Sequence, residues 1–189
     1  SFLDPVPPLC VGAANISLYE MVAAYNTFPS KGMYTRPIFV TRIEDNMGNV
    51  LATFSTTRKE AISDRTAYLM ANLMQGVVNG GTGYALRSRF GLTGEMAGKT
   101  GTTNDNADGW FMGYTPSLVS GCWVGGDDRD IHFTSMSDGQ GASMALPVWA
   151  LYMQKVYADE SLGYSQEEKF NIPEDFDPCA QQTLINNFA

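Results

Sequence analysis

Gly98-Lys-Thr-Gly-Thr-Thr103 decides the fold, because it lies in the first of three strand-like runs that follow one another closely. The runs cover Glu95 to Thr103, Gly109 to Thr115 and Leu118 to Gly126. A tight turn, Thr115-Pro-Ser117, joins the last two, and a connection this short joins antiparallel neighbours. The sequence therefore predicts an antiparallel meander of three strands.

The middle run carries apolar side chains on both faces of the predicted sheet. By the alternation of a strand, Trp110, Met112 and Tyr114 share one face, whereas Phe111 lies on the other. An apolar sheet face must be covered, so we expect helices on both sides.

Three helices are predicted around this sheet. Ser17-Leu-Tyr-Glu20 is a capping box that starts the first helix, and the second runs from Ser63 to about Val78, where Gly80-Gly-Thr-Gly83 ends it. The third covers Ser143 to Ala158, with Pro147 in its first turns or at a kink. Their apolar stripes are, in order, Leu18, Met21, Val22 and Tyr25; Met70, Leu73, Met74 and Val77; and Trp149, Tyr152, Met153 and Val156.

A hairpin is predicted between the first two helices. The turn residues Asn46-Met-Gly-Asn49 separate two runs rich in β-branched and aromatic residues, Arg36 to Asp45 and Val50 to Phe54. Beyond Asp159 the chain becomes polar and irregular, which predicts an extended or loosely ordered tail. The fold class is therefore α+β, an antiparallel sheet flanked by helices.

Composition argues against several functional classes. A net charge of −8 and a pI near 4.5 disfavour binding to nucleic acid or to an anionic membrane surface. No apolar run reaches the ~18 residues of a membrane span, so we expect any membrane anchor to lie outside this chain. Cys10, Cys122 and Cys179 form no Cys-x-x-Cys pair and are expected to be small core residues, while the lone His132 is expected at the surface. The sequence predicts neither a metal site nor a cofactor.

Two other readings of the Lys-Thr-Gly segment fail on spacing. A phosphate-binding loop needs a glycine five residues before Gly98, and that position holds Thr93. A calcium loop beginning at Asn104 needs a bidentate glutamate at the position of Thr115. A plain strand with a solvated lysine is the remaining alternative for an isolated tripeptide.

Several further segments carry a resemblance to a known family. They are Leu18-Tyr-Glu-Met-Val-Ala-Ala-Tyr25, Thr41-Arg-Ile-Glu-Asp45, Gly80-Gly-Thr-Gly-Tyr-Ala85, Ala97-Gly-Lys-Thr-Gly-Thr-Thr-Asn-Asp105, Asp108-Gly-Trp-Phe-Met-Gly-Tyr-Thr-Pro116, Gly121-Cys-Trp-Val-Gly125 and Leu146-Pro-Val-Trp149. In order and spacing the chain resembles class A penicillin-binding proteins over roughly residues 9 to 160. The resemblance implies an incomplete serine β-lactamase and DD-peptidase fold, with residues 1–160 forming the C-terminal portion of a transpeptidase domain and residues 161–189 a polar tail.

The predicted substrate-binding strand consists of Lys99, Thr100, Gly101, Thr102 and Thr103. An extended peptide with a terminal carboxylate can lie along a strand edge, and a glycine leaves room for it. The two hydroxyls at positions 100 and 102 share a face and can both donate to that carboxylate, with the lysine charge close by. The resemblance, rather than alternation, turns the lysine toward the cleft. It also implies that the main-chain N–H at position 102 belongs to an oxyanion hole.

Two motifs of this family are missing from the chain. None of the five lysines has a serine three residues before it, and no serine has an asparagine two residues after it. Thr56-Thr-Arg-Lys59 comes nearest but lies in a polar stretch after the hairpin. We therefore expect the Ser-x-x-Lys nucleophile and the Ser-x-Asn motif to lie upstream, outside the chain, and the fragment alone to be inactive.

The resemblance implies a serine-type peptidoglycan D,D-transpeptidase at the periplasmic face of the bacterial cytoplasmic membrane. Its expected partners are the stem peptide, β-lactams, the missing N-terminal part of its own domain and, in the intact protein, a glycosyltransferase domain. One alternative is a non-catalytic module of the same fold that binds wall peptide or acts as a scaffold. A serine β-lactamase is a further alternative, but it would not share the long Asp108 to Pro116 block.

Overall fold

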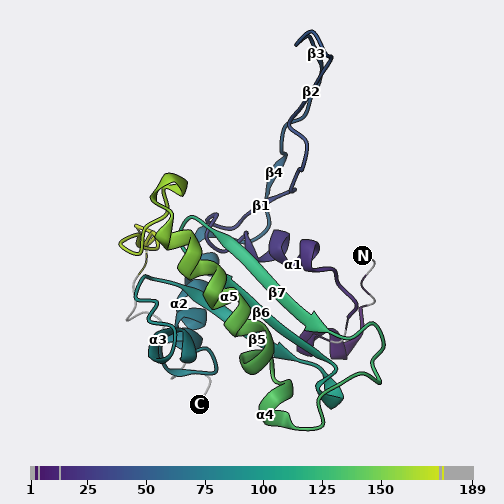
Figure 1. Ribbon diagram of the computed structural model, residues 1–189. Helices are drawn as coiled ribbons and strands as arrows, with labels where there is room; N and C mark the ends of the chain where they lie inside the picture. The colour runs from purple at the N-terminus through teal and green to yellow at the C-terminus, as the bar shows by residue number, and fades with distance from the viewer. Residues whose placement is uncertain (1–2, 4, 13, 175, 177–189) are drawn as a thin grey trace.

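A three-stranded antiparallel sheet forms the centre of the computed structural model, which describes residues 3, 5–12, 14–174 and 176. Its strands are β5 (Ala97–Thr102), β6 (Asp108–Tyr114) and β7 (Val119–Gly125), in the order β5-β6-β7 (Figure 1). The turn before β7 closes as predicted, with hydrogen bonds from Thr115 N–H to the Leu118 carbonyl (2.8 Å) and from Leu118 N–H to Thr115 Oγ1 (3.1 Å). The predicted meander is confirmed.

Helix α5 (Gly141–Ala158) covers one face of this sheet (Figure 1). The fully buried Phe111 ring meets Trp149 edge to face, with 5.1 Å between ring centroids. Pro147 lies inside the helix, and Met153 and Val156 are buried as predicted. Tyr152 is a correction, because its side chain is 45% exposed rather than part of the buried stripe.

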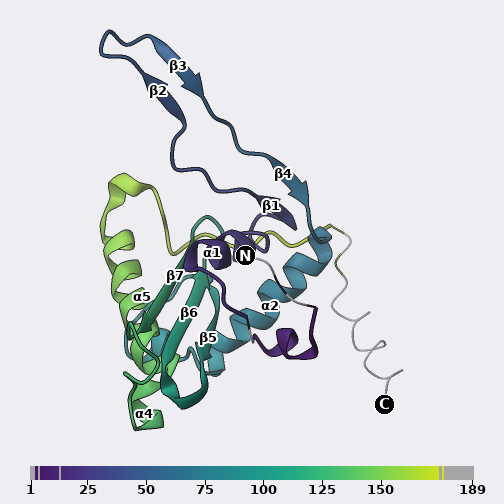
Figure 2. The same ribbon diagram turned by 90° about the vertical axis from the view of Figure 1, so that its right-hand side faces the viewer.

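Helices α1 (Leu18–Tyr25) and α2 (Asp64–Gly80) complete the cover, with α2 running beside β5 (Figure 2). Ser17 makes the predicted capping box with Glu20, and Ser63 caps α2. The buried face of α2 differs from the predicted one, because Leu73 is 68% exposed. The residues that are buried along it are Ala67, Ala71, Met74 and Val78. Alanine or valine at three of these four positions lets α2 pack close to β5.

A second apolar cluster lies on the face of the sheet opposite α5. It is built around the fully buried Tyr114, whose ring contacts Tyr25, Phe28 and Phe170 at centroid distances of 6.4, 6.0 and 5.7 Å. Helices and connecting segments therefore cover both sheet faces, and the α+β fold class is confirmed.

The segment 163–174 follows α5 and contacts the domain closely. Phe170 is buried, its N–H donates to Glu95 Oε2 (2.8 Å), and the Gln166 side-chain oxygen accepts the Thr93 N–H (2.8 Å). Residues 160–162 form a short 3-10 turn, and residues 163–174 form neither a helix nor a strand. The structure adds that this segment lies against the sheet at least as far as Phe170, and the division into a domain and a tail stays a prediction.

Residues 33–60 form a two-stranded ribbon, which we call the arm, that projects from the body (Figures 1 and 2). At its base β1 (Met33–Thr35) pairs with β4 (Arg58–Glu60), and farther out β2 (Arg42–Glu44) pairs with β3 (Val50–Thr53), which confirms the predicted hairpin.

Short helical turns complete the described chain. They are η1 (Pro7–Val11), α3 (Ala85–Ser88), η2 (Asn104–Asn106), α4 (Met136–Gly139) and η3 (Glu160–Leu162). No helix in the part that the structure describes combines the length and apolar character of a membrane span. Cys122 is half-buried with a free thiol whose pKa is raised by burial, and His132 is exposed. Cys179 and the side chain of Cys10 lie outside the described residues.

Candidate active-site strand

Strand β5 lies at one edge of the central sheet. It pairs with β6 alone among the described strands, from Ala97 opposite Tyr114 to Thr102 opposite Gly109. Its exposure increases along its length, because Ala97 and Gly98 are buried whereas Lys99 and Thr102 are exposed. The end that carries the Lys-Thr-Gly residues is therefore open to a ligand.

The outward-facing backbone groups of β5 follow from its hydrogen bonds to β6. Thr103 N–H donates to the Asp108 carbonyl (3.1 Å), so these two residues form a hydrogen-bonded pair. Hydrogen-bonded and non-hydrogen-bonded pairs alternate in an antiparallel ladder, so Thr102 and Thr100 belong to non-hydrogen-bonded pairs. Their N–H and C=O groups point to the open edge, where an extended peptide could pair with them.

The Lys99 side chain reaches this same edge. Lys99 belongs to a hydrogen-bonded pair, and alternation alone places its Cβ on the face opposite Thr100. Its Nζ nevertheless donates to the Thr100 carbonyl (2.9 Å), one of the groups at the open edge. The long, flexible stem allows the ammonium group to leave the face on which its Cβ lies.

The hydroxyls of Thr100 and Thr102 lie on one face, as alternation predicts. Thr100 and Thr102 are the cross-strand partners of Phe111 and Gly109 on β6. All four residues share the face of the sheet that α5 covers. Thr102 Oγ1 accepts the N–H of Gly141, the first residue of α5 (3.0 Å). This hydroxyl keeps its own proton for a ligand, and the positive end of the helix dipole lies beside it.

Thr82 joins the candidate strand, although the sequence analysis predicts no such role for it. Its Oγ1 lies 2.8 Å from Thr100 Oγ1, so the two hydroxyls are hydrogen-bonded. Gly80-Gly-Thr-Gly83 ends a helix as predicted, since α2 ends at Gly80. When Thr82 donates, the Thr100 proton is free to point at a ligand.

Asp108 fixes the far end of β5. Its carboxylate accepts the Thr103 hydroxyl (3.0 Å), Trp123 Nε1–H (3.0 Å) and Arg129 Nη1–H (3.1 Å). Thr103 Oγ1 in turn accepts the Asp108 N–H (2.9 Å), so the Thr103 hydroxyl is engaged within the turn. Gly101 also has an internal reason to be glycine, because a Cβ there would lie 3.1 Å from the Trp110 Cβ.

The segment of the rejected calcium loop is a tight turn. Asp105 and Asn106 have positive φ angles of 59° and 57°, a conformation that Asp and Asn tolerate. The described residues hold no group of three His, Cys, Asp or Glu side chains that could bind a metal ion.

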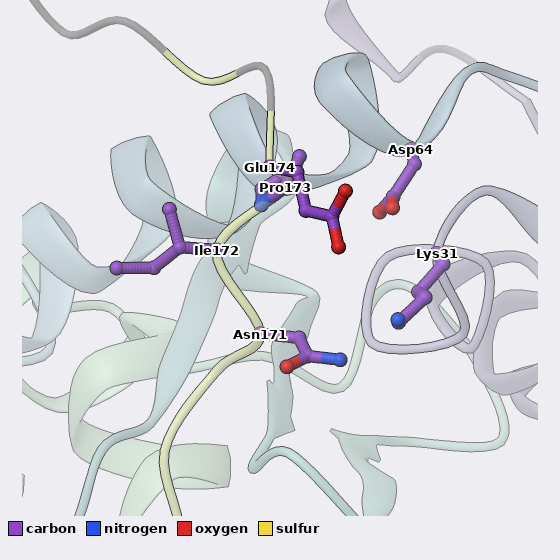
Figure 3. A pocket seen from close by; sticks show the side chains of 6 residues that line it. All are labelled: Lys31, Asp64, Asn171, Ile172, Pro173 and Glu174. Atoms are coloured by element: carbon purple, nitrogen blue, oxygen red, sulfur yellow. The ribbon is translucent and has the colours of Figure 1, made fainter.

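A polar pocket of about 420 Å³ (Figure 3) includes Asp64, the first residue of α2, in its lining. It is lined by Lys31, Asp64, Asn171, Ile172, Pro173 and Glu174. None of the predicted substrate-binding residues lines it, whereas Thr82 and its bond to Thr100 are found beyond the opposite end of α2. This pocket is therefore separate from the candidate strand.

Comparison with known proteins matches residues 9–121 to the family described as penicillin binding protein transpeptidase domain. The chain belongs to this family. Penicillin-binding protein 1A of Aquifex aeolicus is 34% identical over 154 residues, covering 82% of this chain and 20% of the relative. Penicillin-binding protein 1B of Vibrio cholerae is 32% identical over 171 residues, covering 90% and 20%. The predicted family membership is confirmed, and the chain spans about a fifth of the length of these relatives.

Solved structures of penicillin-binding proteins share the fold. The crystal structure of penicillin-binding protein 1A from Haemophilus influenzae matches with a TM-score of 0.76 at 24% identity, covering 88% of this chain and 29% of that one. PonA1 of Mycobacterium tuberculosis in complex with penicillin V matches with a TM-score of 0.70 at 26% identity, covering 90% and 45%. The β-lactamase and DD-peptidase fold predicted for this transpeptidase chain is thus confirmed.

Proposed function

We propose that this chain carries the substrate-binding strand of a serine-type peptidoglycan D,D-transpeptidase of a class A penicillin-binding protein. The observation that supports this best is the open edge of β5, where the Lys99 ammonium and the backbone groups of Thr100 and Thr102 converge. An extended peptide with a C-terminal carboxylate requires a positive charge and hydroxyl donors for the carboxylate. It also requires free backbone N–H and C=O groups with which its own backbone can pair.

In this proposal the stem peptide adds to the sheet along β5. The hydroxyls of Thr100 and Thr102 donate hydrogen bonds to the terminal carboxylate, and the Lys99 ammonium compensates its negative charge. The outward N–H of Thr102 donates to the oxyanion that develops on the penultimate D-alanine carbonyl, and such a donor typically contributes about 3 to 4 kcal/mol. Gly101 keeps the strand free of a side chain at this point, and Thr103 fixes the end of the strand through Asp108.

The nucleophile of this reaction lies outside the chain. A serine activated by a lysine attacks the penultimate carbonyl, the terminal D-alanine leaves with a proton, and the acyl group passes to an amine of a neighbouring stem peptide. A β-lactam would acylate the same serine. The partners are therefore the stem peptide, β-lactams and the upstream part of the same domain, and the intact protein would include a glycosyltransferase domain and act on the periplasmic side of the membrane.

A non-catalytic module that only binds wall peptide would use the same strand edge. The two functions differ in the upstream sequence, because the enzyme requires a Ser-x-x-Lys and, some tens of residues later, a Ser-x-Asn. A protein extended upstream of residue 1 that lacks both motifs would support the module.

The direct test uses a protein extended upstream so that it includes the serine. We expect Lys99→Ala to slow acylation by a fluorescent penicillin by about 10²-fold, with an unchanged melting temperature. Lys155→Ala, an exposed lysine on α5, is the matched control and should acylate at the original rate. An unchanged rate for Lys99→Ala, or loss of the fold, would contradict the proposed role.

The chain of 189 residues alone should form no covalent adduct with penicillin. Its candidate strand supplies hydrogen-bond donors and a positive charge, but acylation requires an activated serine. Intact-mass spectrometry after incubation measures this directly. A stoichiometric mass increase mapped to any residue from Ser1 to Ala189 would show that the nucleophile lies within the chain.

A further inference from the structure

We propose that the arm is a self-association surface, at which β2 pairs antiparallel with β2 of a second copy of this chain. The arm exposes large apolar side chains, among them Phe39 (85%), Met47 (79%) and Leu51 (65%). A ribbon of two strands is marginally stable in water, and adding strands stabilises it. This inference is independent of the proposed function.

The outer edge of β2 offers its backbone for pairing. Phe54 N–H donates to the Thr41 carbonyl (2.9 Å) and Asp45 N–H to the Asn49 carbonyl (3.0 Å), so Thr41 and Asp45 face β3. Arg42 and Glu44 lie between these contacts at non-hydrogen-bonded positions, and their N–H and C=O groups therefore point away from β3. No other described strand pairs with this edge.

The edge of β3 is less suitable than that of β2. Ile43 pairs with Ala52, whereas the next residue, Glu44, pairs with Val50, so Leu51 is an extra residue on β3. A bulge of this kind bends a strand and disrupts a pairing edge. The regular edge of the arm is therefore β2.

The charges on β2 select one register. When Ile43 of one copy lies opposite Ile43 of the other, Arg42 of each copy faces Glu44 of its partner, and both residues present outward backbone groups. A register centred on Arg42 or on Glu44 would instead place like charges opposite each other. Arg42 and Glu44 already form an ion pair within one copy (2.5 Å), so the four charges would alternate in sign across the interface.

The same register also matches the apolar residues and the shape of the molecule. It points the Phe39 end of one arm toward the tip of the other, where Met47 lies in the turn; these two are the most exposed of the large apolar residues on the arm. Phe39 is stacked on Tyr19 of α1 (5.0 Å between centroids), so this end of the arm presents an aromatic pair, with which a methionine sulfur interacts favourably. Since the strands are antiparallel and the arm projects (Figure 2), the two bodies lie at opposite ends of the joined arms. So small an interface gives weak, concentration-dependent association.

Disulfide trapping tests the register. In a background with Cys10, Cys122 and Cys179 replaced by alanine, Ile43→Cys should yield a cross-linked dimer under mild oxidation, because the two Cα atoms would lie about 4.5 Å apart. Thr53→Cys, on the far strand of the same arm, is the matched control and should form no disulfide-linked dimer. Equal cross-linking of both variants, or none of Ile43→Cys, would overturn the proposal.

Charge variants test the pairing chemistry by sedimentation velocity over a concentration series. Arg42→Glu and Glu44→Arg should each remain monomeric, because each places like charges opposite each other. An equimolar mixture of the two should associate, as should the double variant that carries both substitutions, because opposite charges face each other again. Circular dichroism verifies that each variant is folded. A wild-type chain that is monomeric at every concentration, or that associates equally in all variants, would exclude this interface.

Discussion

The central sheet and the arm both contain strand-forming residues that are bounded by turn residues. They differ in what covers their faces. In β6 the alternating side chains of Phe111, Met112 and Tyr114 are no more than 2% exposed, because helices lie on both sides. On the arm, Ile43 and Leu51 are 45% and 65% exposed. Strand formation was therefore decided locally in both regions, but burial was decided by chain segments distant in sequence. The candidate site lies at the edge of the covered sheet, where β6 pairs with its backbone.

Truncating the centre of the covered sheet should have the largest effect. Phe111→Ala removes the ring that packs on Trp149, and we expect the free energy of unfolding to fall by about 3–5 kcal/mol. Phe39→Ala, the matched change on the arm, should alter it by less than about 0.5 kcal/mol. Urea denaturation followed by tryptophan fluorescence measures both, and similar losses would remove the distinction between the two regions.

Loosening the open end of β5 should have an intermediate effect. Asp108→Ala leaves Thr103, Trp123 and Arg129 without their common acceptor and should lower the free energy of unfolding by about 1–3 kcal/mol. Asp127→Ala replaces an exposed carboxylate in the loop after the same sheet and serves as the control. Thermal unfolding of both variants, measured side by side, tests this prediction. Equal unfolding midpoints for Asp108→Ala and Asp127→Ala would refute an anchoring role for Asp108.

A smaller effect, dependent on pH, is expected at Tyr114. Burial, with a contribution from Tyr25, raises the pKa of the Tyr114 phenol above its ordinary value of 10.0. The unfolded chain loses this proton near pH 10 while the folded chain keeps it, so the stability contribution is full below about pH 10 and declines above it. Tyr114→Phe should make the alkaline decline of stability shallower.

At pH 7 the same variant should be as stable as the original chain or more stable by up to about 1 kcal/mol. The reason is that Tyr114 Oη is buried and has no hydrogen-bond partner among the residues that the structure describes. Tyr152→Phe, at an exposed position, is the control. Unfolding curves from pH 7 to 11 provide the measurement, and a Tyr114→Phe curve parallel to the original would contradict the assignment.

Removing the arm should have the smallest effect on the body. Replacing residues 36–57 by Asn-Gly would join β1 to β4 through a tight turn. We expect the free energy of unfolding to change by less than about 1 kcal/mol, since the losses to the body are the exposed hydrogen bond from Tyr19 to the Pro37 carbonyl and the exposed stacking of Phe39 on Tyr19. Calorimetry measures the change, and a loss above about 2 kcal/mol would show that the arm supports the domain.

Much of the fold could be predicted from the sequence because its signals are short-range. The Ser17 capping box, the Asn46 to Asn49 turn and the alternation around Phe111 each depend on residues within a few positions of one another. The apolar face of α2 was predicted less well. Leu73 fits the helical period but faces solvent, because periodicity gives the angular position of a side chain and not where the sheet lies.

The sequence by itself determined the family, the order of the strands along the chain and the common face of Thr100 and Thr102. Only the tertiary structure decided that β5 is an edge strand, that Thr82 meets Thr100 and that the Lys99 ammonium reaches the Thr100 carbonyl. The physical reason is range: helix caps and strand alternation are fixed by neighbouring residues. Edges, hydroxyl contacts and the path of a long side chain depend instead on how distant segments pack.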